Sequence, residues 1–204
     1  MRALFEAGLP ARVAAVISND PAAAGLEYAR QHNVETRVVN HRGFPDRSSF
    51  DAALAAEVAS FTPDLVVLAG FMRILTDTFV TRFAGRLLNI HPSLLPAFTG
   101  VNTHQRALDE GVRFHGCTVH FVTPALDNGP IVIQAAVPVL PEDDATTLAA
   151  RVLEQEHRIY PTAVRWFLEG KVSLEQGRVK LHTALCFPSA VICPGEQNGS
   201  TDKA

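Results

Sequence analysis

The 204-residue sequence has little excess charge, no long apolar run and few cysteines. Its 18 Lys and Arg against 21 Asp and Glu give a formal net charge of −3, so the chain lacks the basic field that nucleic-acid binding needs. The apolar stretches are all shorter than a membrane-spanning helix. The three cysteines form no C-x-x-C pair, which favours a reducing, cytoplasmic location. We therefore expect small-molecule partners, with neither nucleic acid nor a membrane.

The overall composition is that of an ordinary globular protein. Hydrophobic residues make up 47% and charged residues 19% of the sequence, which suits one domain with a core of normal size. We expect that domain to span residues 1–182. Residues 183–204 are rich in Gly, Ser and other polar residues, and we expect a disordered tail there. A monomer and a homodimer are both compatible with these observations.

Short apolar runs alternate with helical patterns through the first half of the chain. The runs "ARVAAVISN" (11–19), "TRVVN" (36–40), "DLVVLAG" (64–70) and "LLNIH" (87–91) are typical of buried strands. Strands that alternate with helices indicate an α/β fold with an open, mostly parallel twisted sheet and helices on both faces. In the C-terminal half, "FHGCTVHFV" (114–122) and "GPIVIQAAVPV" (129–139) predict neighbouring antiparallel strands.

Two longer helices carry specific predictions about their ends. The segment "SSFDAALAAEVASF" (48–61) is helical in pattern, and Ser48 or Ser49 is the expected cap. The segment 145–170 is the longest helical pattern in the chain. Pro161 lies inside it and is expected to kink or interrupt the helix unless a new helix begins there.

Polar residues at the ends of the predicted strands are the candidates for chemistry. Asn89 and His91 alternate at the end of one apolar strand, so their side chains project to the same side. Asp127 follows a later strand, in the turn "LDNG". Ligands of open α/β sheets bind outside the carboxyl ends of the strands, and these three side chains are expected to meet there. An amide donor, an imidazole and a carboxylate together suit an acyl-type transfer.

Each of these residues also has a purely structural interpretation. His91 alone could bond a backbone carbonyl at the strand end. Asn89 could cap a turn, and Asp127 could be an ordinary turn residue that bonds its own backbone. The residues alone leave both interpretations open.

Other histidines and one cysteine are further candidates for metal ligands or nucleophiles. The spacing of His104, His115 and His120 matches no pattern of metal ligands, and we expect no metal. His120 leads into the Asp127 turn and is a candidate to line the same site. Cys117 is expected to be a small core residue instead of a nucleophile.

Four segments carry a resemblance to a known family. They are "VVLAGFMRIL", "GRLLNIHPSLLPAFTGVNTHQRALDEG", "HGCTVHFVTPALDNGPIVIQ" and "QEHRIYP". They resemble the successive motifs of the folate-dependent formyltransferases, and the likeness runs from about Ala11 to about Leu181. The "THQRALDEG" and "QEHRIYP" segments are similar to the branch that formylates glycinamide ribonucleotide in purine biosynthesis. The wider family includes methionyl-tRNA formyltransferases and formyltetrahydrofolate deformylases.

The resemblance implies a reaction and a catalytic trio. The formyl group of 10-formyltetrahydrofolate would pass to the amine of 5-phosphoribosylglycinamide through a tetrahedral intermediate. Asn89 would donate a hydrogen bond to the oxyanion, and protonated His91 would stabilise it and help to protonate the leaving nitrogen. Asp127 would keep His91 cationic.

The resemblance also assigns binding residues. It places the folate against Asn89 and against a further set of residues, namely Arg47, Met72, Arg73, Ile74 and Leu75. Glu156 corresponds to a residue that faces glycinamide ribonucleotide. Neither a metal nor a redox cofactor is implied.

One part of the family pattern has no counterpart in this sequence. Family members open with an apolar strand and a Gly- and Ser-rich loop, whose backbone amides hold the substrate phosphate. The segment from Met1 to Asn19 resembles the helix that follows and the next strand, so we expect an N-terminally truncated form of the domain. The alternatives are a related enzyme such as a deformylase, and an inactive remnant that still binds folate.

Overall fold

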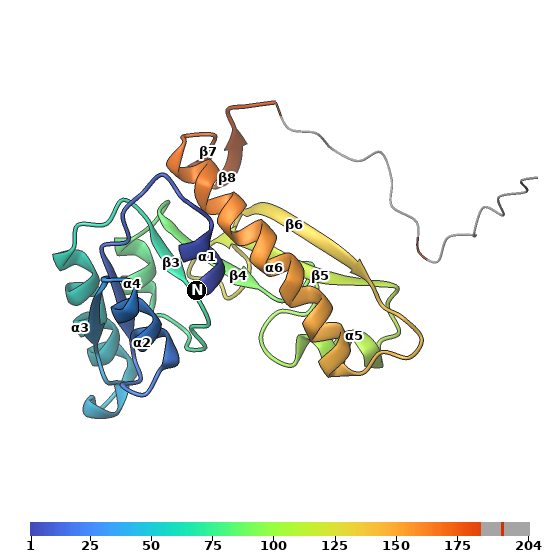
Figure 1. Cartoon of the computed structure of the whole chain (residues 1–204), viewed down its shortest axis with the longest axis horizontal. Coiled ribbons are helices and arrows are strands. Elements are labelled where there is room, and N and C mark those ends of the chain that lie inside the picture. Colours follow the sequence, from blue (N-terminus) through green and yellow to red (C-terminus); the bar gives the residue numbers. More distant parts are fainter. Residues whose placement is uncertain (185–192, 194–204) are drawn as a thin grey trace, which may run out of the picture.

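The computed structural model describes residues 1–184 and residue 193, and Figure 1 shows an α/β architecture. The strands are β1 (Ala15–Ser18), β2 (Glu35–Val38), β3 (Val66–Leu68), β4 (Leu87–His91), β5 (Phe114–Phe121), β6 (Ile131–Pro138), β7 (Val172–Glu175) and β8 (Arg178–Leu181). The helices are α1 (Arg2–Glu6), α2 (Ala24–Gln31), α3 (Arg47–Ser60), α4 (Asp77–Arg82), α5 (Thr103–Asp109) and α6 (Ala145–Leu168), with a 3₁₀ turn at His41–Gly43.

The strands form three sheets within the described residues. β1 pairs with β2 in parallel, and β3, β4, β5 and β6 follow one another in a four-stranded sheet. The β3–β4 pair is parallel, whereas β4–β5 and β5–β6 are antiparallel. β7 and β8 make a separate hairpin. This open arrangement confirms the predicted α/β fold class, including the antiparallel strands of the C-terminal half.

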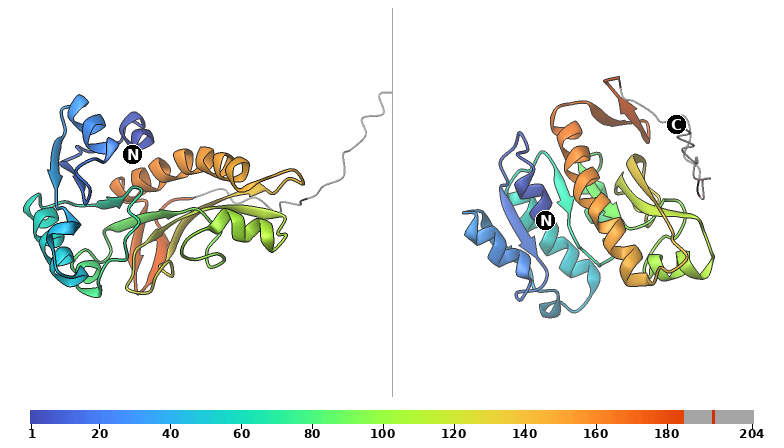
Figure 2. Two further views of the ribbon diagram at one scale, coloured as in Figure 1. Left: turned by 90° about the horizontal axis from the view of Figure 1, so that it is seen from below. Right: turned by 45° about the vertical axis from the view of Figure 1, so that its right-hand side comes forward.

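Both faces of the four-stranded sheet are covered, as the sequence predicts. Leu88 of β4 packs in the cluster around α6, and the preceding Leu87 packs in the cluster around α3 and α4. Successive residues of a strand point to opposite faces, so the two leucines anchor a helical layer on each side. Figure 2 shows α6 lying along one face of β5 and β6.

Two predictions about helix ends require correction. The cap of α3 is Asp46, which accepts a hydrogen bond from the Ser49 backbone N–H, so Ser48 and Ser49 lie inside the first turn. α6 is a single 24-residue helix that contains Pro161, so the predicted interruption is wrong. Pro161 is buried together with Tyr160 and Ala163, and packing of both halves against the sheet outweighs one missing helical hydrogen bond.

The C-terminal tail and a membrane span are the remaining subjects of the sequence predictions. The expected disordered tail, 183–204, falls almost entirely outside the described residues. Among the described helices, none is both long and apolar enough to cross a membrane. α6 is long, but its buried side carries the apolar residues and its other side is largely exposed.

Candidate active site

The register between β4 and β5 sets the positions of the central residues. Asn89 lies opposite His120, and His91 lies opposite Thr118. Because alternate residues share a face, these four side chains project to the side away from α6, whereas Leu88 and Val119 face it. The end of β4 and the facing part of β5 therefore place four polar side chains on one face of a sheet whose other face is apolar.

His91 and Asp127 form a pair that is largely shielded from solvent. His91 Nδ1 lies 3.5 Å from Asp127 Oδ2, and the two side chains are 7% and 9% exposed. His91 Nε2 lies 2.9 Å from the carbonyl oxygen of Phe98. Both neighbours are hydrogen-bond acceptors, so each ring nitrogen has an oxygen to which it can donate.

Asn89 is oriented by His120. The His120 Nδ1–H donates to the Phe121 carbonyl at 3.0 Å, because a carbonyl can only accept. Nε2 is then the acceptor for the Asn89 side-chain amide at 3.3 Å. Burial lowers the pKa of His120, which keeps this ring neutral and this role fixed. Within the part of the chain that the structure describes, the other Asn89 N–H has no partner and can donate to a ligand.

The turn that carries Asp127 depends on close backbone packing. Asp127 has φ +50°, and its Oδ2 accepts a hydrogen bond from the Gly100 backbone N–H at 2.8 Å. A Cβ at Gly129 would lie 1.7 Å from the Phe121 carbonyl oxygen, so only glycine allows the turn to fold back on β5. The turn residues thus place the carboxylate beside His91.

The other histidines and Cys117 have distinct environments. His104 Nδ1 and His115 Nε2 lie 3.2 Å apart, and burial lowers the pKa of His115 to about 4. Within residues 1–184 and 193, no three His, Cys, Asp or Glu side chains gather as metal ligands. Cys117 is fully buried, and burial raises the pKa of its thiol to about 12. This confirms Cys117 as a core residue.

The predicted folate-binding segment is a loop between β3 and α4. Met72 and Ile74 are 81% and 52% exposed, whereas Leu75 is buried in the core beside α3 and α4. The Arg73 guanidinium lies 5.3 Å from the centroid of the Phe50 ring. Arg47 is exposed at the start of α3, and in the described part of the chain no hydrogen bond or ion pair joins it to the trio.

Glu156 lies on α6, on the other side of the sheet from His91. It interacts electrostatically with the Met1 amino group, and burial raises the pKa of the Glu156 carboxyl while that ammonium group opposes the shift. No hydrogen bond within the described residues joins Glu156 to Asn89, His91 or Asp127. The structure therefore brings His91 and Asp127 together, with Asn89 on the same face of β4, and leaves Glu156 apart from them.

Sequence reasoning missed the backbone groups that complete the site. The Phe98 carbonyl and the Gly100 N–H contact His91 and Asp127, respectively. Every residue carries such groups, so no residue type marks them. The positive φ of Gly100, +79°, fits the glycine at that position and is the one local signal.

The chain is similar in sequence and in structure to known formyltransferases. Residues 1–164 match the formyl transferase family. The phosphoribosylglycinamide formyltransferase of Escherichia coli is 49% identical over 164 residues, which are 80% of this chain and 77% of that protein. The structure of the phosphoribosylglycinamide formyltransferase of Coxiella burnetii superposes with a TM-score of 0.84 at 44% identity, covering 88% of this chain and 86% of the other.

A second enzyme of the family is a more distant neighbour. The formyltetrahydrofolate deformylase of Burkholderia mallei is 31% identical, with a TM-score of 0.74. The superposition covers 83% of this chain and 59% of the deformylase. Its identity and TM-score are both lower than those of the Coxiella burnetii structure.

Proposed function

The chain belongs to the formyl transferase family, and we propose that it transfers the formyl group of 10-formyltetrahydrofolate to the amine of 5-phosphoribosylglycinamide in purine biosynthesis. The observation that carries this proposal is the shielded His91–Asp127 pair beside Asn89 at the end of β4. The 49% identity to the enzyme from Escherichia coli supports the choice of acceptor.

The trio suits the charge that develops during the transfer. The amine attacks the formyl carbon, and the carbonyl electron pair moves to oxygen, which becomes an oxyanion. The free Asn89 N–H donates to that oxyanion, and the positive charge of His91 stabilises it. When the bond from carbon to N10 breaks, the carbonyl re-forms, N10 takes the electron pair of the broken bond and a proton, and the attacking nitrogen releases a proton to solvent. His91 supplies this proton once Nε2 exchanges the Phe98 carbonyl for the substrate.

We propose that Asp127 stabilises a positive charge on the His91 ring. Its carboxylate lies 3.5 Å from Nδ1 and is fixed by the Gly100 N–H. An anion at that distance favours the imidazolium, and low exposure reduces screening by water. We propose that this pair supplies the proton that N10 takes.

We assign residues that bind the two substrates from the family resemblance and from their positions in the fold. We propose that the folate lies along the exposed loop at Met72, Arg73 and Ile74, with Arg47 near its anionic glutamate. Backbone groups of a loop can recognise the edge of a heterocycle, and exposed apolar side chains can cover its faces. Leu75 supports this loop from the core, and Glu156 is assigned to the glycinamide substrate by family resemblance.

The proposed setting is a small-molecule enzyme of the cytoplasm. A net charge of −3 gives no support to a nucleic-acid partner. We propose a monomer or a homodimer, which light scattering coupled to size-exclusion chromatography distinguishes directly. The alternative activity, hydrolysis of formyltetrahydrofolate, is favoured less because the deformylase is the more distant neighbour.

His91→Ala tests the function. We expect kcat for formyl transfer to fall by about 10²–10⁴-fold, the usual contribution of a positioned acid or base. Binding of a folate analogue, measured by fluorescence titration, should persist because the substitution leaves the loop between β3 and α4 intact. Near-normal turnover in His91→Ala would remove His91 from the mechanism. Release of formate without formylated amine in the parent chain would favour the deformylase.

A further inference from the structure

One short backbone segment contacts both members of the His91–Asp127 pair. The Phe98 carbonyl accepts a hydrogen bond from His91 Nε2 at 2.9 Å. Two residues later, the Gly100 N–H donates to Asp127 Oδ2 at 2.8 Å. We call residues 98–100 the strap. A shift of the strap would change the orientation of the imidazole and of the carboxylate together.

The strap needs support from outside its own backbone. It lies in no helix or strand, so no backbone ladder holds it. Phe98 has φ +53°, a conformation that is disfavoured for any residue with a side chain. Such a conformation persists only where neighbouring groups hold it. The strap therefore depends on side chains that bind it.

Arg106 binds the strap at two points. Its Nη1 donates to the Thr99 carbonyl at 2.6 Å, and its guanidinium lies 5.5 Å from the centroid of the Phe98 ring. Arg106 belongs to α5, and Thr103 at the start of α5 donates through Oγ1 to the Pro92 carbonyl at 2.7 Å. The end of β4, the helix α5 and the strap are thus connected by side chains. A planar guanidinium can stack on a ring and donate hydrogen bonds at the same time.

We propose that Arg106 is a positioning residue for formyl transfer, which acts by holding the strap against His91 and Asp127. This inference rests on the proposed function for its kinetic consequence. Its structural consequence does not, because the orientation of His91 can be observed without substrate. Arg106 has no role in the chemistry itself: it touches the strap, and the strap touches the pair.

The direction in which the His91 titration shifts distinguishes this role of Arg106 from a purely electrostatic one. If Arg106 acted only as a nearby positive charge, its removal would make His91 easier to protonate. If Arg106 holds the strap, its removal loosens two acceptors that favour the protonated ring, and His91 becomes harder to protonate. The other titratable groups around this ring are Asp127, His104, His115 and His120, and all of them remain in every variant.

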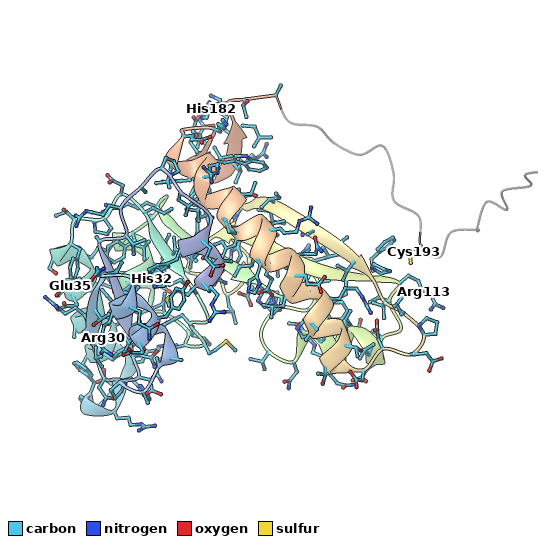
Figure 3. The ribbon with its side chains drawn as sticks, in the orientation of Figure 1. Arg30, His32, Glu35, Arg113, His182 and Cys193 are labelled. Atoms are coloured by element: carbon cyan, nitrogen blue, oxygen red, sulfur yellow. The ribbon has the colours of Figure 1, made fainter. Side chains whose placement is uncertain are left out.

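The experiment compares Arg106→Gln with Arg106→Lys and with a matched control, Arg113→Gln. Arg113 is exposed near the edge of the molecule in Figure 3, just before β5. The His91 ring is titrated by NMR in the unliganded chain, and kcat and KM are measured for both substrates. Thermal unfolding confirms that each variant is folded.

We expect Arg106→Gln to move the midpoint of the His91 titration down by about half a pH unit. We expect kcat to fall about tenfold with little change in either KM, because misplacement of catalytic groups acts on turnover. Arg106→Lys, which keeps the charge and one donor but loses the planar stack, should give a smaller shift of the same sign. Arg113→Gln should match the parent.

Two results would overturn the proposal. An upward shift of the His91 midpoint would assign Arg106 a charge role, and an unchanged midpoint with unchanged kcat would assign it none. If Arg106→Gln does not fold, the sign of the shift in Arg106→Lys decides: no shift, or an upward one, rejects the strap. A parent chain without formyl transfer would reject the proposed function, and the NMR titration would still decide on the strap.

Discussion

At the scale of single residues, the central fact is that each nitrogen of the His91 ring faces an oxygen. Asp127 Oδ2 and the Phe98 carbonyl oxygen are both acceptors, so neither can supply a proton to the ring. His120, the penultimate residue of β5 and opposite Asn89, has a different environment and is kept neutral by burial. Two buried histidines on one sheet face therefore have different surroundings: both nitrogens of His91 face acceptors, whereas His120 Nε2 accepts from Asn89.

Asp127→Asn should separate the charge of Asp127 from its shape. The amide keeps the size of the side chain but removes the anion beside His91, so the imidazolium is favoured less. If turnover needs protonated His91, the rate declines as the pH rises, and this decline should move to lower pH in the variant. We also expect kcat to fall about 100-fold. The measurement is kcat as a function of pH.

A suitable control for that experiment is Asp109→Asn, at an exposed position of α5. It removes one negative charge from the chain without touching the pair. We expect its pH–rate profile to match the parent. If Asp127→Asn also gave an unchanged profile with full activity, Asp127 would be a turn residue only.

His115 should make the chain less stable in acid. Burial, the largest cause, and the neighbouring His104 lower the pKa of His115 to about 4 from 6.5. As the pH falls below 6.5, the unfolded chain binds a proton that the folded chain refuses, so the stabilising difference is present above pH 6.5 and is lost toward pH 4. The shift corresponds to about 3 kcal/mol of unfolding free energy. Urea unfolding across this pH window measures it.

His115→Gln should reduce that pH dependence because the variant has one fewer buried histidine. Burial also lowers the pKa values of His104 and His120, so part of the dependence should remain. The control is His32→Gln: His32 is exposed at the C-terminal cap of α2, among the N-terminal elements in Figure 3. Equal slopes in the parent and in His115→Gln would contradict the assignment.

At the scale of elements, α3 holds the loop that we assign to the folate. Asp51, which is only 2% exposed, accepts a hydrogen bond from the Thr76 backbone N–H at 2.5 Å. The adjacent Phe50 lies under the Arg73 guanidinium. Two neighbouring residues of one helix thus bind the loop in its middle and at its end.

Asp51→Asn should therefore affect folate binding more than turnover. Replacing the carboxylate by an amide weakens a charge-assisted hydrogen bond and costs about 1–3 kcal/mol of unfolding free energy. We expect KM for 10-formyltetrahydrofolate to rise several-fold while kcat changes little, since the trio lies on other elements. Steady-state kinetics with the folate varied tests this. A loss of stability with KM unchanged would make Asp51 a structural residue alone.

The elements also show what the sequence can and cannot predict. β1, β4 and α6 were predictable because apolar residues recur with the period of a strand or a helix. The predicted cap of α3 lies two or three residues after the observed cap, because Asp46, Ser48 and Ser49 all suit an N-cap and only the backbone decides among them. The seven-residue helix α5 was not predicted, since two turns give too little periodicity.

The candidate site also has features that the sequence predicts and features that it does not. The meeting of Asn89, His91 and Asp127 follows from their positions at strand ends, and the structure brings His91 and Asp127 together. The pairing of Asn89 with His120 needs the register of β4 against β5, which the pattern does not contain. The strap contacts were unpredictable because they use backbone atoms in a loop whose path is determined by tertiary packing.

At the scale of the whole molecule, the described residues form two unequal parts. β1 and β2 form a sheet of their own, whereas β5 is bonded on both sides within the four-stranded sheet. β1 and β2 contain no fully buried residue, and seven of the eight residues of β5 are buried. Figure 2 shows the N-terminal strands beside the larger sheet. Fewer hydrogen bonds and less burial predict lower local stability for residues 12–38.

Arg165 of α6 is one link between these parts, because it donates to the carbonyls of Ala7 and Gly8 at 2.6 and 3.3 Å. Native-state hydrogen exchange should show β1 and β2 opening at a free energy roughly 2 kcal/mol below that of β4 and β5. Arg165→Gln should lower the protection of residues 1–38 further and leave β5 unchanged, because it removes bonds to the N-terminal segment alone. Arg158→Gln, at an exposed position of the same helix, is the control. A common opening free energy for β1 and β5 would instead show that the chain unfolds as a single cooperative unit.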